Sequence, residues 1–261
     1  MIIKIYYLRG KKMFSEIQQN TITQQIIHQI HTAILAGKLA AGDKLPSEND
    51  MIKQFNISKQ TLRESLRALE HMGLLEMRKG MGGGSFIIEV DSQITKLSLV
   101  NYFYFKNLSI KDLSQVRRLI EPNSARLAAK NMSDENILKL KELNHSANKH
   151  LNDNNYKALL DCEIAFHIKI TEVTNNPLIG LLMEFIEDIV VDYKKIFHVG
   201  IDYLKVVLQA HENIYQAIKD RDEKQAYNAM LDHIIDLENN LSTKESNISI
   251  KDVYSKKNIL N

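Results

Sequence analysis

The segment from residue 45 to residue 86 constrains the fold of this 261-residue chain more than any other. It reads LPSENDMIKQFNISKQTLRESLRALEHMGLLEMRKGMGGGSF. Pro46 is expected to open a short helix, because proline suits the first helical turn and Glu48 and Asp50 place acidic groups where they favour the helix dipole. The segment therefore begins with a helix, and a turn is expected at residues 56–58.

A second helix is predicted over residues 59–72. Ser58 is a good N-cap for it, Gly73 is typical of a helix end, and its inner face carries Leu62, Leu66 and Leu69. Two short strands, residues 74–77 and 85–88, are predicted on either side of a Gly-rich loop. This order of elements, a helix, a turn, a second helix and a hairpin, is that of a winged helix-turn-helix. The segment is therefore predicted to bind double-stranded DNA.

One more helix completes the predicted DNA-binding domain, which spans residues 21–91. Apolar residues recur at helical spacing from Ile22 to Ile34. Residues 1–20 are expected to be an N-terminal extension, and both Met1 and Met13 are compatible with the true start.

The rest of the chain predicts a mainly α protein. Residues 110–242 carry apolar positions three and four apart without a strand signal, which predicts an antiparallel bundle of six or seven helices. Residues 92–109 are expected to form a linker and the start of the bundle, and residues 243–261 a frayed tail. Pro122 lies within a strongly helical run and is expected to kink or break that helix.

Composition excludes several classes of protein. The chain is 44% hydrophobic and 25% charged, as in ordinary globular proteins, and its formal net charge is +2. A single cysteine, Cys162, excludes an intramolecular disulfide and a Cys-rich zinc cluster. No apolar run has the length of a membrane span, so a cytoplasmic protein without a membrane partner is expected.

The residues expected to read DNA lie mainly at the start of the second helix. Lysine and arginine donate to guanine, glutamine pairs with adenine, and hydroxyl groups donate to phosphate oxygens. These candidates are Ser58, Lys59, Gln60, Thr61 and Arg63, with Lys79 and Gly80 in the wing. The alternative is that they are ordinary solvated side chains. Because residues 13–90 contain equal numbers of basic and acidic residues, DNA affinity cannot depend on bulk positive charge.

This segment resembles the winged-helix domain of the GntR superfamily of bacterial regulators. The resemblance is carried by Ala41 to Glu48, Ile57-Ser58, Thr61 to Leu66, Gly73-Leu74 and Gly80. It adds Glu48 and Asn49 to the expected DNA-contacting residues. Asn49 and Lys59 stand where the family usually has arginine, so an altered operator sequence or weaker binding is expected.

Four polar residues in the helical half lie on otherwise apolar helix faces. Glu163 and His167 are one turn apart, while His211 and His233 belong to later helical stretches. Three imidazoles and a carboxylate suit a divalent metal: zinc first, with nickel, manganese or iron as alternatives. The alternative, which the residue pattern leaves open, is that these are packed, hydrogen-bonded core residues.

The helical half resembles the FCD effector-binding domain of the FadR-like GntR regulators. The resemblance is carried by the segments 116–121 and 125–129, by Glu163 to His167, by residues 176–178, and by the last two histidines. It implies that Glu163, His167, His211 and His233 hold the metal, although the family usually has aspartate at the first position. It also implies that Arg117, with Glu121 one turn away, binds the carboxylate of a small effector; an intrahelical ion pair is the alternative.

These features predict a transcription factor, in the first instance a repressor, whose DNA binding responds to a small organic or sugar acid in a metal-containing bundle. A homodimer on a palindromic operator is implied, because a two-fold protein presents two reading heads. One alternative keeps the DNA binding but gives the pocket a fatty-acyl or other organic ligand and no metal. A more remote one is a metal-dependent enzyme.

Overall fold

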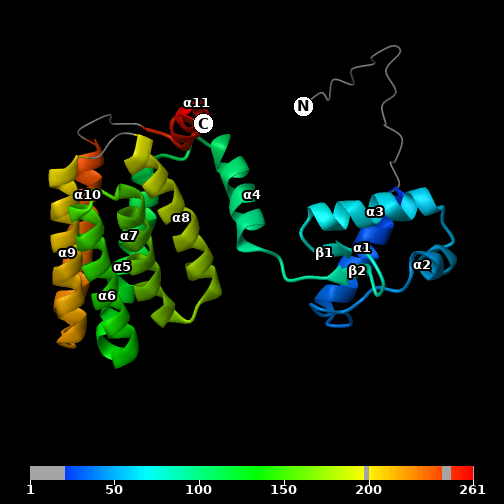
Figure 1. The fold of residues 1–261 in the computed structure, drawn as a ribbon, viewed down its shortest axis with the longest axis horizontal. Helices are drawn as coiled ribbons and strands as arrows, with labels where there is room; N and C mark the ends of the chain where they lie inside the picture. The colour runs from blue at the N-terminus through cyan, green and yellow to red at the C-terminus, as the bar shows by residue number, and fades with distance from the viewer. Residues whose placement is uncertain (1–20, 197–199, 243–247, 261) are drawn as a thin grey trace, which may run out of the picture. The chain divides into compact units, whose positions relative to one another are not determined.

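The computed structural model describes residues 21–196, 200–242 and 248–260, so the expected N-terminal extension lies outside the described residues. The chain divides between Ile94 and Thr95 into two compact units. The described residues are mainly helical, with one two-stranded sheet in the first unit, which confirms the predicted fold class (Figure 1).

The first unit contains three helices whose starts are fixed by side-chain caps. They are α1 (Ile22–Leu35), α2 (Glu48–Phe55) and α3 (Lys59–His71). Thr21, Ser47 and Ser58 each accept a hydrogen bond from the backbone amide three residues later. Helix α2 therefore begins after Ser47, and the expectation that Pro46 opens it was wrong, because the serine hydroxyl supplies the cap.

A small apolar core holds these helices together. Leu62, Leu66 and Leu69 of α3 are fully buried against Ile26 and Ile30 of α1. Gly73, which follows α3, has a φ of +72°, a conformation that favours glycine, and the amide of Leu74 donates back to the carbonyl of Leu69. The inner face predicted from the leucine spacing is confirmed.

The wing is an antiparallel hairpin of β1 (Leu75–Arg78) and β2 (Gly84–Ile87). The segment before α2 runs along the free edge of β2, because Leu45 N donates to Ser85 O at 2.9 Å and Ile87 N donates to Asp43 O at 2.8 Å. Lys44 Nζ donates to Gly82 O at 3.1 Å, so the lysine ties the wing tip to this edge.

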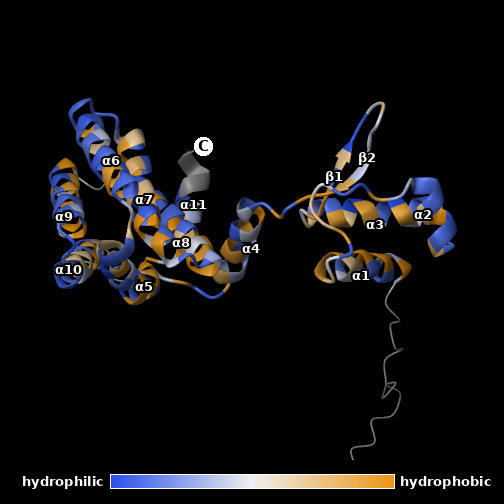
Figure 2. Ribbon diagram, turned by 90° about the horizontal axis from the view of Figure 1, so that it is seen from below, coloured by the Kyte–Doolittle hydropathy of each residue, from blue (hydrophilic) through white to orange (hydrophobic). Residues whose placement is uncertain are grey.

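The second unit is built around one long central helix. Helix α5 (Ile110–Asn131) contacts each of the other helices that surround it, α7 (Tyr156–Thr171), α8 (Pro177–Ile196), α9 (Ile201–Lys219) and α10 (Glu223–Ser242). Helix α6 (Asp134–Asn152) packs on α7 and α9, and the short helix η1 (Glu172–Thr174) follows α7. Apolar and polar residues alternate along these helices, as amphipathic packing requires (Figure 2).

Two local expectations for the second unit can be stated more closely. Helix α5 runs through Pro122 without a break, and the proline is buried. The segment expected to form a linker and the start of the bundle contains helix α4 (Ser92–Tyr104). Its buried Lys96 donates to Asp188 of α8 at 2.8 Å, and this bond holds α4 on the bundle.

The expected frayed tail instead contains helix α11 (Ile250–Leu260). Ile248, Ile250 and Val253 are buried in the same core as residues of α8. The amide of Ile250 donates to Leu108 O at 2.8 Å, and the amide of Ile110 donates to Ile248 O at 3.1 Å. The segment is polar in overall composition, but these three apolar residues are enough to pack its helix against the bundle.

The apolar core of the bundle is divided by a polar layer. Leu113 at the start of α5 belongs to one apolar cluster and Ala125 further along it to another. Between them lie the buried residues Arg117 and Glu121. In the part of the chain that the structure describes, no helix is both long and apolar enough to cross a bilayer.

Candidate nucleic-acid surface and metal centre

Most of the residues expected to read DNA are exposed on the first unit. Asn49, Ser58, Lys59, Gln60, Arg63, Lys79 and Gly80 are exposed, while Glu48 and Thr61 are half-buried. They lie on α2, at the start of α3 and at the turn of the wing. This arrangement leaves the N-terminal turns of α3 open to a DNA groove.

Some of these side chains already have partners. The Ser58 hydroxyl accepts from Thr61 N at 3.1 Å as the N-cap of α3, so its first role is structural. Arg63 Nε donates to Glu48 Oε2 at 3.2 Å. Both of these side chains retain solvent access, so this pair holds the guanidinium in place without burying it.

Three further basic residues on this unit were missed by the sequence reasoning. Arg67 lies one helical turn after Arg63 on α3 and is exposed, and this i, i+4 spacing could have revealed it. Lys44 and Arg78 lie over the ring of Phe86 at 5.6 Å and 4.3 Å from its centroid. Their position depends on strand pairing, so no local signal marked them.

Three histidines from three helices meet in the polar layer of the bundle. His167 is on α7, His211 on α9 and His233 on α10, and all three are at most 3% exposed. The Nε2 atom of His167 lies 3.1 Å from Nε2 of His211 and 3.3 Å from Nε2 of His233. The structure therefore brings together three of the four ligands that the resemblance implied.

The spacing of these nitrogens fits a metal ion. Zinc–imidazole bonds of about 2.0–2.1 Å at angles between roughly 90° and 110° separate neighbouring nitrogens by about 2.8–3.4 Å. Burial, and next the neighbouring imidazole of His167, hold the pKa of His211 well below its usual range; burial and then His211 do the same for His233. Neutral imidazoles are the form that binds a metal.

The other ring nitrogen of His167 is held by a carboxylate. Nδ1 of His167 contacts Glu121 Oε2 closely, an arrangement that leaves Nε2 free to face the other two histidines. His211 is held differently, because its ring stacks on Phe166 with centroids 4.4 Å apart. These contacts fix the direction of each imidazole.

Arg117 is enclosed by carboxylates. It is 1% exposed, its Nε donates to Glu121 Oε1 at 2.5 Å, and its Nη2 lies 3.1 Å from Glu187 Oε1. Burial alone would lower the pKa of Arg117, but Glu121 and Glu187 outweigh that effect and raise it. Likewise burial would raise the pKa of Glu121, but Arg117 and then His167 bring it well below its usual range. The intrahelical ion pair considered from the sequence is thus present.

Glu187 of α8 was missed by the sequence reasoning. Together with Glu121 and His167 it forms a second buried group of residues able to hold a metal ion. Its position in an apolar helix, IGLLMEFIEDIVV, was the available signal, since a buried carboxylate in such a stretch needs a partner.

Glu163, the fourth ligand implied by the resemblance, does not join the histidine group in this structure. Its Oε2 accepts a hydrogen bond from Lys194 Nζ at 2.8 Å, and its buried Oε1 has no hydrogen-bond partner among the described residues. Both side chains are buried, Glu163 to 2% exposure and Lys194 to 7%. Lys194 lies in α8, where no sequence pattern marked it.

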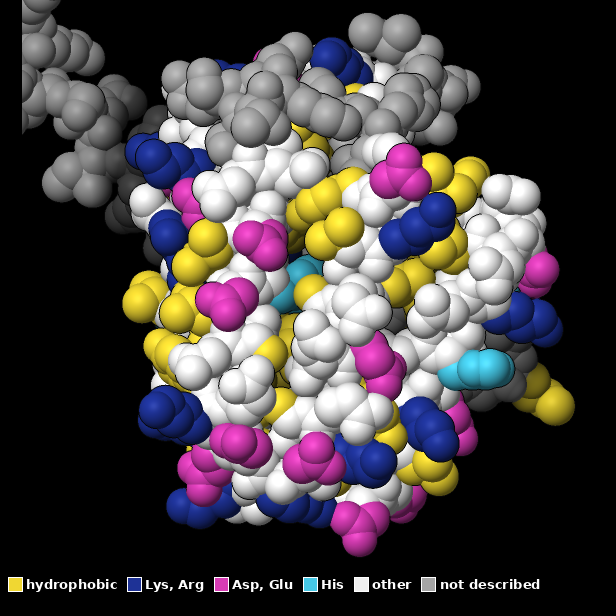
Figure 3. Space-filling model, turned by 90° about the vertical axis from the view of Figure 1, so that its left-hand side faces the viewer, with side chains coloured by type: hydrophobic (Ala, Val, Ile, Leu, Met, Phe, Trp, Pro, Cys, Tyr) yellow, Lys and Arg dark blue, Asp and Glu magenta, His cyan; other side chains and the backbone are white. Residues whose placement is uncertain are grey.

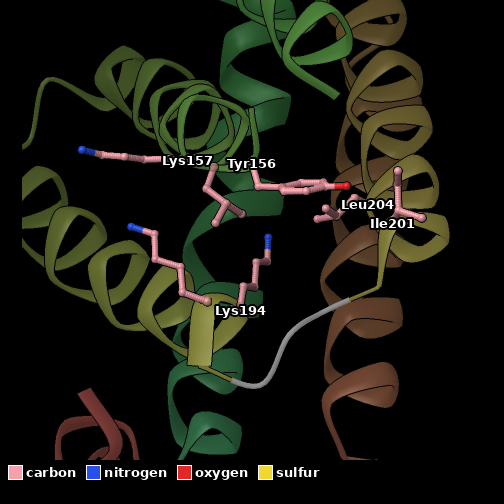
Figure 4. A pocket seen from close by; sticks show the side chains of 7 residues that line it. Tyr156, Lys157, Lys194, Ile201 and Leu204 are labelled. Carbon is pink, nitrogen blue, oxygen red and sulfur yellow. The ribbon is translucent and has the colours of Figure 1, made fainter. Parts of the chain in front are cut away.

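A cavity of about 660 Å³ opens beside this ion pair. It is lined by an apolar wall and by lysines: Tyr156, Lys157, Leu160, Lys194, Lys195, Ile201 and Leu204. Figure 4 shows Lys194 extending from α8 toward the side of the cavity that carries Tyr156 and Leu204. The described residues that line the cavity include three lysines and no acidic residue, so it suits a small anion that also has an apolar part.

On the face of the bundle drawn in Figure 3, the positively charged side chains do not gather in one patch. Lysine and arginine are interspersed there with aspartate and glutamate, and apolar side chains lie between them. A surface of this kind does not attract a polyanion such as DNA as a whole.

Comparison with known families places both halves of the chain. The family described as "Bacterial regulatory proteins, gntR family" matches residues 22–84, and the family described as "FCD domain" matches residues 112–236. The chain belongs to the GntR family of bacterial regulators.

Relatives of this GntR-family protein share its length and architecture. The HTH-type transcriptional regulator LutR of Bacillus subtilis is 28% identical over 211 residues, covering 79% of this chain and 94% of the relative. The HTH-type transcriptional repressor NanR of Klebsiella aerogenes is 26% identical over 216 residues, covering 82% of each chain. A solved structure, Streptococcus agalactiae GntR, matches with a TM-score of 0.59 at 25% identity over 82% of this chain and 97% of that one.

These matches establish the general activity. The GntR-family protein is a DNA-binding transcriptional regulator with an FCD effector domain, and it is not an enzyme. The remote alternative of a metal-dependent enzyme is thereby set aside.

Proposed function

We propose that this regulator is a homodimeric repressor of the FadR-like subfamily that binds a palindromic operator and responds to a small carboxylate held at a metal in its FCD domain. The metal part of this proposal is carried by the approach of His211 Nε2 and His233 Nε2 to His167 Nε2, at 3.1 and 3.3 Å, with ligand atoms of all three residues within 4.8 Å of one another. The repressor mode is supported by the likeness to NanR, which is named a repressor.

The operator is read by the exposed start of α3 and by the wing. Lys59, Gln60 and Arg63 face base edges, and Ser58 and Thr61 face phosphates, because this end of the second helix enters the major groove in such folds. Glu48 and Asn49 adjoin them on α2. Lys79 and Gly80 approach the sugar–phosphate strand, where glycine removes the side-chain obstruction.

The metal is held by His167, His211 and His233, with Glu163 as the fourth ligand. When bound, a divalent ion supplies a positive centre to which a carboxylate oxygen of the effector binds. Glu121 orients His167 from behind. Arg117, which pairs with Glu121 and Glu187, balances the buried carboxylates around the site.

Metal removal tests the proposal directly. The protein is purified without chelator, its metal content is measured, and its binding to its own promoter is followed by fluorescence anisotropy before and after removal of the metal. We expect about one ion per chain, and a change in operator affinity or in the effect of added sugar acids once the metal is gone.

His211→Ala provides the matching variant. It removes one ligand, and we expect metal affinity to fall at least about 100-fold while the far-ultraviolet circular dichroism spectrum is retained. His145→Ala, at an exposed position on α6, is the control and should leave metal affinity unchanged. If His211→Ala keeps the metal content of the native protein, His211 is a core histidine and the metal proposal fails.

The metal-free alternative rests on one observation of its own. Glu163 already has a charged partner in Lys194, and the neighbouring cavity has an apolar wall of Leu160, Ile201 and Leu204. A protein that contains well under one ion per chain, and cannot be loaded with zinc, nickel or manganese, would instead take a wholly organic ligand in this cavity.

A further inference from the structure

The ion pair between Lys194 and Glu163 has one partner in the wall of the cavity and the other on α7, the helix that carries His167. Lys194 lines the cavity and donates to Glu163 at 2.8 Å, and Glu163 lies one helical turn before His167 on α7. The second carboxylate oxygen of Glu163 is buried without a hydrogen-bond partner among the described residues. A buried, half-satisfied carboxylate has free energy to gain from a further cation.

The formal charges of the polar layer point the same way. Three carboxylates, those of Glu121, Glu163 and Glu187, lie within it, and two cations, Arg117 and Lys194, accompany them. One negative charge is left over. A divalent ion converts this excess to one positive charge, which a ligand with a single carboxylate then neutralises.

We infer that Lys194 is a built-in competitor of the metal: it occupies Glu163 until a divalent ion takes that carboxylate, and it then turns into the cavity to hold an anionic ligand. The exchange breaks one ion pair and forms one metal–carboxylate bond. It assigns Lys194, rather than Arg117, as the residue that meets the carboxylate of the ligand.

The surroundings of the two cations support this assignment. Arg117 is enclosed by Glu121 and Glu187, neither of which lines the cavity. Lys194 has a flexible four-carbon stem with one end already in the cavity wall (Figure 4), so a change of its side-chain rotamer is enough to redirect the ammonium group. The class of ligand that results is a small carboxylate with an apolar part that rests on Leu160 and Leu204.

The inference rests on the proposed metal site, so its test begins with the metal alone. Binding of zinc is measured by competition with a chromogenic chelator for the native protein and for Lys194→Met. We expect Lys194→Met to bind zinc about tenfold more tightly or better, because no ion pair has to be broken and a nearby positive charge is gone. Lys195→Met, at an exposed position in the same cavity wall, is the matched control and should leave the affinity unchanged.

A second measurement uses the native protein and so avoids any change in folding. Lysines are acetylated briefly with acetic anhydride, with and without bound zinc, and the extent at each lysine is read by peptide mass spectrometry. The buried Lys194 should react severalfold faster in the zinc-loaded protein, because its ammonium group has left Glu163. Lys157 and Lys195, both exposed in the cavity wall, serve as internal standards and should not change.

The outcomes separate the inference from the function on which it rests. If the native protein binds no zinc, the proposed metal site fails, and the inference with it. If zinc binds but Lys194→Met binds it no more tightly, and Lys194 reacts at the same rate in both states, the metal site stands and the exchange is refuted. Should Lys194→Met prove unstable, Lys194→Met combined with Glu163→Gln removes both charges, and the acetylation of the native protein still decides.

Discussion

His167 joins two buried groups of residues into one site. Its Nε2 faces His211 and His233, while its Nδ1 faces Glu121, which in turn pairs with Arg117. The imidazole therefore connects the group that suits a metal to the buried ion pairs of Glu121, Arg117 and Glu187. A charged residue added to or removed from this network is expected to act on both groups at once.

Arg63 lies on α3 of the first unit, so its contribution to operator binding can be tested without changing a residue of the bundle. Arg63→Ala should weaken operator binding at least tenfold, because it removes a guanidinium that is already directed by Glu48 on the exposed face of α3. Fluorescence anisotropy with the protein's own promoter measures the effect. Arg126→Ala, on an exposed part of the bundle helix α5, should bind the operator as the native protein does. Equal loss in the two variants would contradict a specific role for Arg63.

The sequence predicted the histidines better than it predicted their fourth partner. His167, His211 and His233 could be found because each interrupts an apolar helix face, and this pattern is local. Whether Glu163 turns toward them or toward Lys194 depends on how α7 and α8 lie against each other. Lys194, like Glu187, is brought to the site by packing between helices that are remote in sequence, and a helix period read from one segment carries no such information.

At the scale of single elements, the caps determine where helices begin. Ser109 and Ser249 cap α5 and α11, each with an aspartate three residues further on, and the two serines face each other across an antiparallel bridge. Two helix starts are thereby fixed at the same place. Hydrogen bonds from the nearby serines lower the pKa of both Asp112 and Asp252.

These caps predict a pH dependence. A carboxylate whose pKa is lowered by folding stabilises the native state above its unfolded value, near 3.8 here, and that contribution is lost as the pH falls through the folded value. Asp252→Asn should therefore cost about 0.5 kcal/mol at pH 7, a small figure because the group is mostly exposed and screened, and less at pH 3. Urea unfolding at both pH values measures it. Glu142→Gln, an exposed carboxylate on α6, is the control; an equal loss in Asp252→Asn at both pH values would rule out the ionised cap.

Local signals recovered most helices of this chain but missed α11. Ser47, Ser58 and Gly73 are capping residues whose effect is confined to one turn, and for this reason α3 and its neighbours could be read from the sequence. Helix α11 could not, because its few apolar residues are diluted by lysine, serine and asparagine and become meaningful only against α8. Pro122 does not end α5, although its nitrogen cannot donate a hydrogen bond within the helix.

At the scale of the whole molecule, charge is sorted locally. The formal net charge is +2, and the bundle face in Figure 3 mixes both signs. Attraction to DNA therefore depends on a few side chains of the winged helix. This limits how strongly operator binding should respond to salt.

The salt dependence is a measurable consequence. If the positive charges of Lys59, Arg63 and Lys79 each displace one condensed counterion from the DNA in both subunits of a dimer, the logarithm of the binding constant should fall with the logarithm of salt concentration at a slope of about −5. Fluorescence anisotropy titrations at KCl concentrations from about 50 to about 300 mM measure the slope. Lys79→Ala should reduce its magnitude by about 2, one phosphate per subunit. A slope near −10 would mean that other basic residues, with Lys44, Arg67 and Arg78 as the first candidates, also contact the phosphates.

The backbone hydrogen bonds between residues 108–110 and 248–250 also affect the order in which the two units can fold during synthesis. The winged helix is complete within the first 94 residues and has its own core, so it can fold while translation continues. The bundle has to wait, because the segment that closes it against the start of α5 is made after the other helices of the bundle. A growing chain is thus expected to possess its DNA-binding head before the domain that controls it.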